Sequence, residues 1–235
     1  MRGEVEHVSP YLSVDGLTVE YTLGSHRSRV LENVSFEAGR DEIVLALGPS
    51  GSGKTTLLSV LAGLLRPASG RVILDGRDVI DLEGRDLLAY RRNNVGIVFQ
   101  TFNLVPSLSA LENVMAPLVL TGVRSAVARR TARRLLDEVD LADHAHQRPG
   151  TLSGGQQQRV AFARALVNNA PVILADEPTA HLDPVQVDAI LRLIRGLRGQ
   201  GRLVVVATHD ARFEPLADRV VSLGQHSAVG TIEAR

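Results

Sequence analysis

A glycine-rich stretch holds the residues of this sequence whose types and spacing point most directly to chemistry. Residues 48–55 read Gly-Pro-Ser-Gly-Ser-Gly-Lys-Thr, which matches the phosphate-binding pattern G-x-x-x-x-G-K-[ST] at every fixed position. Glycines let backbone N–H groups approach phosphate oxygens, and Lys54 offers a compact ammonium to the outer phosphates. Thr55 supplies a hydroxyl that can ligate Mg²⁺. The stretch therefore predicts a nucleotide phosphate site that also takes a magnesium ion.

The elements on both sides of this stretch are those that such a site requires. An apolar run over residues 42–47 predicts a strand, and helical spacing from Thr55 to Leu65 predicts a helix. The helix would direct its positive N-terminal end toward the bound anion. A chance glycine turn is the alternative, but it does not account for the order of strand, loop and helix.

Three further apolar runs end in polar side chains that could join the site. They cover residues 95–99, 172–175 and 203–207, and they are followed by Gln100, by Asp176 and Glu177, and by Thr208 and His209. Their continuous apolar character is typical of parallel strands that are covered on both faces. Because ligands bind at the carboxyl ends of parallel strands, we expect these polar residues at one edge of a sheet.

Each of these polar residues has a chemical interpretation and a simpler alternative. Asp176 could support Mg²⁺, and Glu177 could accept a proton from an attacking water or orient it. Taken alone, the two carboxylates also fit a turn at the end of a strand. His209 could hydrogen-bond a γ-phosphate, although a lone histidine is often a surface or helix-capping residue.

A second candidate anion site lies in residues 152–159, Leu-Ser-Gly-Gly-Gln-Gln-Gln-Arg. Ser153 can cap a helix while Gln156, three residues later, completes a capping box. Gly154 and Gly155 leave backbone N–H groups open between them. The alternative is a well-capped helix start without a ligand.

In order and approximate spacing, these motifs resemble those of ABC-type ATPase subunits over residues 12–223. The resemblance implies that Gly48, Pro49, Ser50, Gly51, Ser52, Gly53, Lys54, Thr55 and Thr56 form the Walker A loop and bind ATP. It further implies that Ser153, Gly154, Gly155 and Gln156 form the signature motif and that Asp183 is the D-loop aspartate. It assigns Glu177 as catalytic base, His209 as switch histidine and Gln100 as Q-loop glutamine, with Thr55, Gln100 and Asp176 as the Mg²⁺ residues.

An aromatic residue should stack on the adenine in proteins of this family. Tyr21, at the end of the first predicted strand, resembles that residue. Tyr11 is the alternative, and either tyrosine could simply contribute to packing.

The resemblance also implies a fold and an assembly. The expected fold is α/β, a P-loop NTPase (RecA-like) core with an N-terminal antiparallel β subdomain and an inserted α-helical subdomain at about residues 101–165 of a single domain, 1–235. One Walker A loop and one signature imply that two chains, most simply a homodimer, enclose two ATP molecules head to tail. An integral membrane permease is the further partner that the family implies.

The stretch from Phe99 to Val114 indicates a subgroup within this family. It is similar to the Q-loop region of subunits that serve lipoprotein-release and macrolide-export permeases. The expected function is therefore an ATP-hydrolysing motor subunit of an export or mechanotransmission transporter. The alternative is a single-cassette ABC ATPase that drives a membrane complex of the cell-division type without moving a substrate.

Composition excludes several other classes of protein. The chain has 235 residues, of which 44% are hydrophobic, and it contains no Cys. Its 26 basic residues are balanced by 26 acidic residues, so a role in coating nucleic acid is not expected. No apolar run approaches the roughly eighteen residues of a spanning helix, and no secretory signal is visible, so we expect a chain that stays in the cytoplasm. The family resemblance implies that its permease partner holds it peripherally at the cytoplasmic face of the inner membrane. A Ras-type GTPase needs a second lysine for its base-reading motif, and Lys54 is the only lysine. His144 and His146 lack converging ligands and are predicted to be surface residues.

Overall fold

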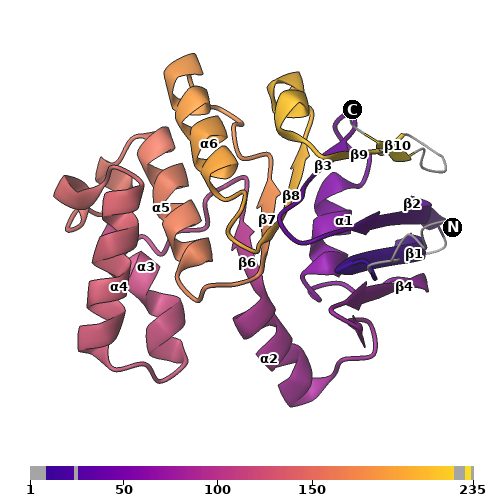
Figure 1. Cartoon of the computed structure of the whole chain (residues 1–235), viewed down its shortest axis with the longest axis horizontal. Helices are drawn as coiled ribbons and strands as arrows, with labels where there is room; N and C mark the ends of the chain where they lie inside the picture. Colours follow the sequence, from indigo (N-terminus) through magenta and orange to yellow (C-terminus); the bar gives the residue numbers. More distant parts are fainter. Residues whose placement is uncertain (1–8, 24–25, 225–230, 234–235) are drawn as a thin grey trace, which may run out of the picture.

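Two β-sheets organise residues 9–23, 26–224 and 231–233, which the computed structural model describes (Figure 1). The strands are β1 (Leu12–Leu23), β2 (His26–Ala38), β3 (Ile43–Leu47), β4 (Ser69–Leu74), β5 (Arg77–Asp78), β6 (Val95–Val98), β7 (Val172–Asp176), β8 (Leu203–Thr208), β9 (Arg219–Ser222) and β10 (Thr231–Glu233). The α-helices are α1 (Lys54–Leu61), α2 (Gly84–Asn94), α3 (Ala110–Leu120), α4 (Ser125–Glu138), α5 (Gly154–Leu166) and α6 (Pro184–Gly196). Short 3-10 helices cover η1 (Ala142–His144), η2 (Pro149–Thr151) and η3 (Ala211–Leu216).

The larger sheet has the order β10-β9-β3-β8-β7-β6, and its strands are parallel except for β10. Every residue of β7 and β8 is buried, as the continuous apolar runs predicted. Side chains of β7 alternate between two cores. Ile173 packs in the core shared with α3 to α6, and Leu174 packs in the core shared with α1 and the smaller sheet. The parallel sheet is thus covered on both faces.

The smaller sheet is antiparallel, with the order β2-β1-β4-β5. Val14 and Leu17 of β1 share a core with Leu57 and Val60 of α1, so this sheet packs over α1 (Figure 1). The expected α/β fold with an N-terminal antiparallel β subdomain is confirmed.

Helices α3, α4 and α5 pack against one another beside the parallel sheet (Figure 1). Helix α3 begins at a capping box, in which Ser109 caps the helix and Glu112 binds back to the Ser109 backbone. Among the described residues, none of the helices has both the length and the apolarity that a membrane span requires.

The helix after the glycine-rich loop ends earlier than the sequence pattern predicted. It stops at Leu61 rather than at Leu65, because Gly63 adopts a left-handed φ of 64°. The N–H of Leu64 then bonds to the carbonyl of Ser59, and that of Gly63 to Val60. These are the bonds of a Schellman motif, which ends a helix at glycine.

The contact between β6 and α5 depends on a glycine. A Cβ atom at Gly96 would lie 2.2 Å from the carbonyl oxygen of Ala165. We expect Gly96→Ala to lower the free energy of unfolding by about 1–3 kcal/mol, the usual cost of overpacking a close contact. Urea denaturation of the full chain measures this change.

Gly196→Ala is the matched control, because no heavy atom lies within 4 Å of a Cβ built at the end of α6. Alanine is the better helix former there, so this variant should be as stable as the wild type or slightly more stable. Equal stability of the two variants would contradict the close approach of β6 to α5.

Candidate functional site

A pocket of about 460 Å³ lies where the carboxyl ends of β3, β7 and β8 face the end of β1. Its lining residues are Tyr21, Val30, Pro49, Ser50, Gly51, Gly53, Lys54, Thr55, Thr56, Gln100, Glu177 and His209. Polar residues from four predicted strand ends are thus brought together at one edge, as parallel strands require.

Glycines permit the tight path of the loop between β3 and α1. Gly53 has a φ of 91°, and a Cβ there would lie 2.5 Å from the Leu31 side chain. A Cβ at Gly48 would lie 2.4 Å from the carbonyl oxygen of Leu223. No side chain in the described part of the chain caps the start of α1, so the first N–H groups of the helix remain available to an anion.

The Lys54 ammonium is held inside this loop and is only 6% exposed. Its Nζ donates hydrogen bonds to the carbonyl oxygens of Gly48, at 2.7 Å, and Pro49, at 3.0 Å. It also forms an ion pair with Glu177 Oε1 at 3.2 Å. The ammonium therefore lies at the floor of the pocket, paired with the carboxylate that the sequence predicted as the base.

Glu177 is fixed from three directions. Besides Lys54, it accepts a hydrogen bond from Thr208 Oγ1 at 3.0 Å and lies 3.0 Å from His209 Nδ1. Burial by itself raises the pKa of this carboxyl, but the hydrogen bonds from its three partners outweigh burial and lower the pKa. Its backbone is left-handed, with a φ of 43°. The carboxylate is therefore ionised at neutral pH and oriented toward the pocket that it lines.

Asp176 and Thr55 make a separate contact under the loop. Thr55 Oγ1 donates to Asp176 Oδ2 at 2.8 Å, whereas Asp176 Oδ1 is buried and has no partner among the described residues. Burial raises the pKa of this carboxyl, and the Thr55 hydrogen bond opposes that effect. A hydroxyl, a carboxylate with a free oxygen and the nearby amide of Gln100 are hard oxygen donors, so these residues fit Mg²⁺.

The predicted second anion site is formed as a helix start but lies outside the pocket. Ser153 Oγ accepts from the Gln156 N–H at 3.3 Å, and Gln156 Oε1 accepts from the Ser153 N–H at 2.8 Å. This is the expected capping box at the start of α5. Neither these two residues nor Gly154 or Gly155 line the pocket of their own chain.

Three other predicted positions have defined surroundings. Asp183 caps α6 by accepting from the Gln186 N–H at 2.9 Å, and it does not line the pocket. Tyr21 lines the pocket with a side chain that is 43% exposed. Tyr11, the alternative, is buried under Arg40, whose guanidinium lies 3.8 Å from the ring centroid. Of the two tyrosines, only Tyr21 is placed to meet a ligand in the pocket.

Sequence reasoning missed two contacts of the site residues. Thr208 orients Glu177 through a hydrogen bond. The sequence hinted at this role, because Thr208 is a polar residue at the end of an apolar run, directly before His209. His144 is half-buried rather than a surface residue, and its Nε2 lies 3.1 Å from Gln156 Nε2. His144 lies on η1, twelve positions before Gln156 in the sequence, so no local sequence pattern predicts this contact. His146 is exposed, as expected.

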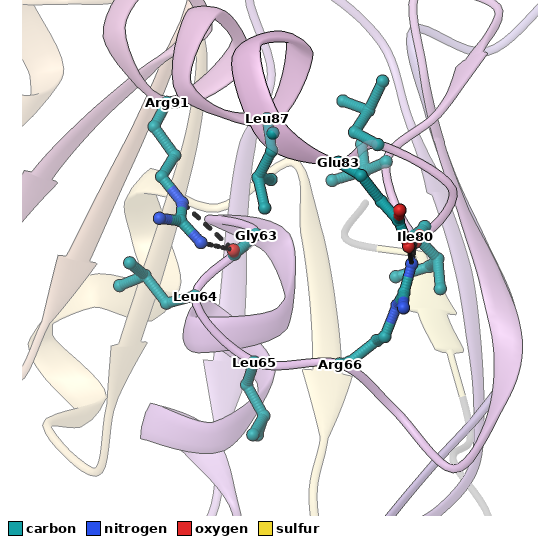
Figure 2. A pocket seen from close by; sticks show the side chains of 11 residues that line it. Gly63, Leu64, Leu65, Arg66, Ile80, Glu83, Leu87 and Arg91 are labelled. Atoms are coloured by element: carbon teal, nitrogen blue, oxygen red, sulfur yellow. Dashed lines mark hydrogen bonds and ion pairs between the residues drawn. The ribbon is translucent and has the colours of Figure 1, made fainter.

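A smaller pocket, of about 290 Å³, lies between the end of α1 and the start of α2 (Figure 2). Its arginines are already engaged: Arg91 donates to the carbonyl oxygen of Gly63, and Arg66 binds Glu83 at 2.9 Å. Leu87 and Ile80 supply apolar lining. It contains no predicted site residue, so the pocket at the strand ends is the candidate site.

Comparison with known proteins gives a consistent family. A family model described as ABC transporter matches residues 31–180. An uncharacterized ABC transporter ATP-binding protein of Mycobacterium tuberculosis is 56% identical over 212 residues, which cover 90% of this chain and 64% of that protein. One from Thermotoga maritima is 48% identical over 190 residues, 81% of each chain. The macrolide export ATP-binding/permease protein MacB 1/2 of Paracoccus denitrificans is 44% identical over 215 residues, covering 92% of this chain and 32% of that protein.

Solved structures agree with this fold. The dimeric structure of MJ0796, a bacterial ABC transporter cassette, superposes with a TM-score of 0.89 at 38% identity and covers 95% of this chain and 99% of its own. The post-hydrolysis state of the same cassette, bound to ADP and Pi, gives a TM-score of 0.87 with the same identity and coverage. The chain spans 64% of the length of the mycobacterial relatives that it matches.

Proposed function

The chain belongs to the ABC transporter family as an ATP-binding cassette, and from this premise we propose that it hydrolyses ATP to drive a membrane transporter. One observation carries the proposal. A phosphate-binding loop, a paired lysine and an oriented carboxylate converge in a single pocket at the strand ends. The named relatives favour an export transporter over the alternative complex that transmits force without transport.

We assign the residues of the pocket to the parts of ATP. Gly48 to Thr56 would bind the phosphates through backbone N–H groups and the Lys54 ammonium. The exposed ring of Tyr21 would stack on the adenine. Thr55 and Gln100, with Asp176 behind them, would hold Mg²⁺, which neutralises phosphate charge when bound.

Two residues would act at the γ-phosphate of the bound ATP. Glu177 is the ionised carboxylate that would orient the attacking water and accept its proton. His209 has a 68% exposed side chain beside this carboxylate, so it can reach an outer phosphate oxygen as the switch histidine. Because its Nδ1 faces Glu177, its other ring nitrogen is available to the phosphate.

A second cassette would complete each site. Ser153, Gly154, Gly155, Gln156 and Asp183 lie outside the pocket of their own chain, which is expected of residues that serve the partner. A head-to-tail pair would bring the start of α5 of one chain to the γ-phosphate bound by the other. The dimeric state of the MJ0796 cassette supports this assembly.

We propose that an integral membrane permease is the other partner and that it holds the cassette at the cytoplasmic face of the inner membrane. Helix α2 and the end of α3 border a groove of about 500 Å³, where Leu88 is 62% exposed and Leu120 is 87% exposed. Exposed apolar side chains at a groove are typical of a protein interface. The helical subdomain, at about residues 101–165 of the single domain, would move with this partner.

Nucleotide binding can be tested at a single NMR resonance. The sequence contains one lysine, so [¹⁵N]lysine labelling yields one backbone amide signal, that of Lys54. We expect this signal to shift with ATP and ADP but not with adenosine, because the loop binds phosphates. Phosphate release from Mg-ATP measures turnover in the same preparation. An unshifted signal together with no phosphate release would contradict the proposal.

The membrane partner can be captured with the Glu177→Gln chain. Detergent-solubilised source membranes are incubated with the variant and Mg-ATP, and co-purifying proteins are identified by mass spectrometry. A four-helix permease with a large extracytoplasmic domain supports the export assignment. A many-helix importer permease, or recovery of soluble complexes alone, would contradict it.

A further inference from the structure

We propose that Arg164 is a positioning residue that sets the conformation of the segment after Gln100 and links it to the groove between α2 and α3. The inference deepens the proposed function and rests on it, because Gln100 is there a Mg²⁺ residue. Arg164 lies on α5, the helix that begins at the signature.

The Arg164 guanidinium spans two consecutive carbonyl groups. Its Nη1 donates to the carbonyl oxygen of Asn103 at 2.5 Å, and its Nη2 donates to that of Phe102 at 2.7 Å. Both residues are left-handed, with φ values of 60° for Phe102 and 47° for Asn103. Left-handed backbone is unusual for non-glycine residues, above all for a bulky one, so other contacts must hold it. The planar guanidinium of arginine provides such a contact, because its two Nη atoms can donate to neighbouring carbonyl groups at the same time.

The charge of Arg164 strengthens this constraint. The side chain is half-buried, and burial lowers the pKa of its guanidinium below the ordinary value. Among the described residues, no carboxylate forms an ion pair with it, so backbone carbonyl dipoles are what compensate the charge. Because a partly desolvated charge without hydrogen bonds is costly, a change in the left-handed conformation of the segment requires Arg164 to bind other acceptors.

The same side chain faces the groove. Arg164 lines it together with Leu88, Pro117, Leu120 and Asn168. Asn168 lies one turn further along the chain than Arg164, and its Oδ1 is buried with no partner among the described residues. A permease segment in the groove would therefore contact both Arg164 and Asn168. Occupation of the groove would alter the bonds that hold Phe102 and Asn103, and through them the position of Gln100.

Hydrogen exchange of the full chain tests this link without nucleotide. The amides of Phe102 and Asn103 donate to Phe99 and Thr101, so they are protected when the segment is ordered. In Arg164→Met we expect exchange over residues 100–104 to be at least tenfold faster, with α5 unchanged. Arg164→Lys keeps the charge but loses the fork, and it should give an intermediate increase.

Arg91→Lys is the matched control, because Arg91 lines the same groove but donates its two hydrogen bonds to the carbonyl of Gly63 rather than to the segment after Gln100 (Figure 2). It should leave exchange over residues 100–104 unchanged. A second readout is the Mg²⁺ concentration for half-maximal hydrolysis, which should rise severalfold in Arg164→Lys. Its affinity for ADP without Mg²⁺ should remain within twofold of wild type.

Three results would overturn the role of Arg164. These are unchanged exchange over residues 100–104, equally faster exchange throughout α3 to α5, and an equal effect of Arg91→Lys. The last two would indicate a general packing role. If the wild-type chain does not hydrolyse ATP, the proposed function fails, and the exchange experiment still tests Arg164. If hydrolysis is normal and exchange is unchanged, the inference about Arg164 alone fails.

Discussion

Glu177→Gln is expected to slow ATP hydrolysis by about two to four orders of magnitude, the usual contribution of a positioned general base. Glutamine has nearly the same shape but cannot accept the proton of the attacking water. Nucleotide binding should persist or tighten, because Glu177 forms an ion pair with Lys54 at 3.2 Å. Removal of that negative charge leaves the ammonium free for phosphate. Phosphate release gives the rate, and calorimetry with ADP gives the affinity.

The choice of ADP separates two causes of tighter binding. ATP affinity would also rise if the inactive variant were trapped as a dimer, which light scattering detects.

Glu214→Gln is the matched control, because Glu214 is exposed on η3 and lies outside the pocket. It should hydrolyse ATP at the wild-type rate. Wild-type turnover in Glu177→Gln would show that another group is the base.

Lys54→Ala is expected to weaken nucleotide binding by about one to two orders of magnitude. A hydrogen bond to a charged group contributes about 1.5–3 kcal/mol, which corresponds to this range. Lys54 also forms an ion pair with Glu177, another residue that lines the pocket. Calorimetry with ADP and with ATP in the absence of Mg²⁺ measures the loss.

Two comparisons make this result specific to the ammonium. Lys54→Arg keeps the positive charge but brings a planar fork that does not match the geometry of the loop, so it should restore binding only partly. Thermal unfolding of Lys54→Ala shows whether the fold survives. A folded Lys54→Ala chain with wild-type affinity for ADP would contradict the assignment of Lys54 to the phosphates.

The parts of the site that depend on local chemistry could be predicted from the amino-acid sequence. The glycine-rich loop, the strand before it and the helix after it could be predicted together, because each follows from residue types at fixed spacing. The capping box of Ser153 and Gln156 was likewise predictable, because its partners are three residues apart. The buried parallel strands were visible as apolar runs. Their ends also identified Gln100, Glu177 and His209, which line one pocket.

The contacts between these parts, in contrast, follow from the three-dimensional fold. The contacts of Thr55 with Asp176 and of Lys54 with Glu177 join residues more than a hundred positions apart, so no local pattern contains them. The partial burial of His144 and the hydrogen bonds of the Arg164 guanidinium depend on how the helices pack. Hydrophobic periodicity fixes which face of an element is buried, but the choice of partner for a buried polar group depends on the assembled neighbours.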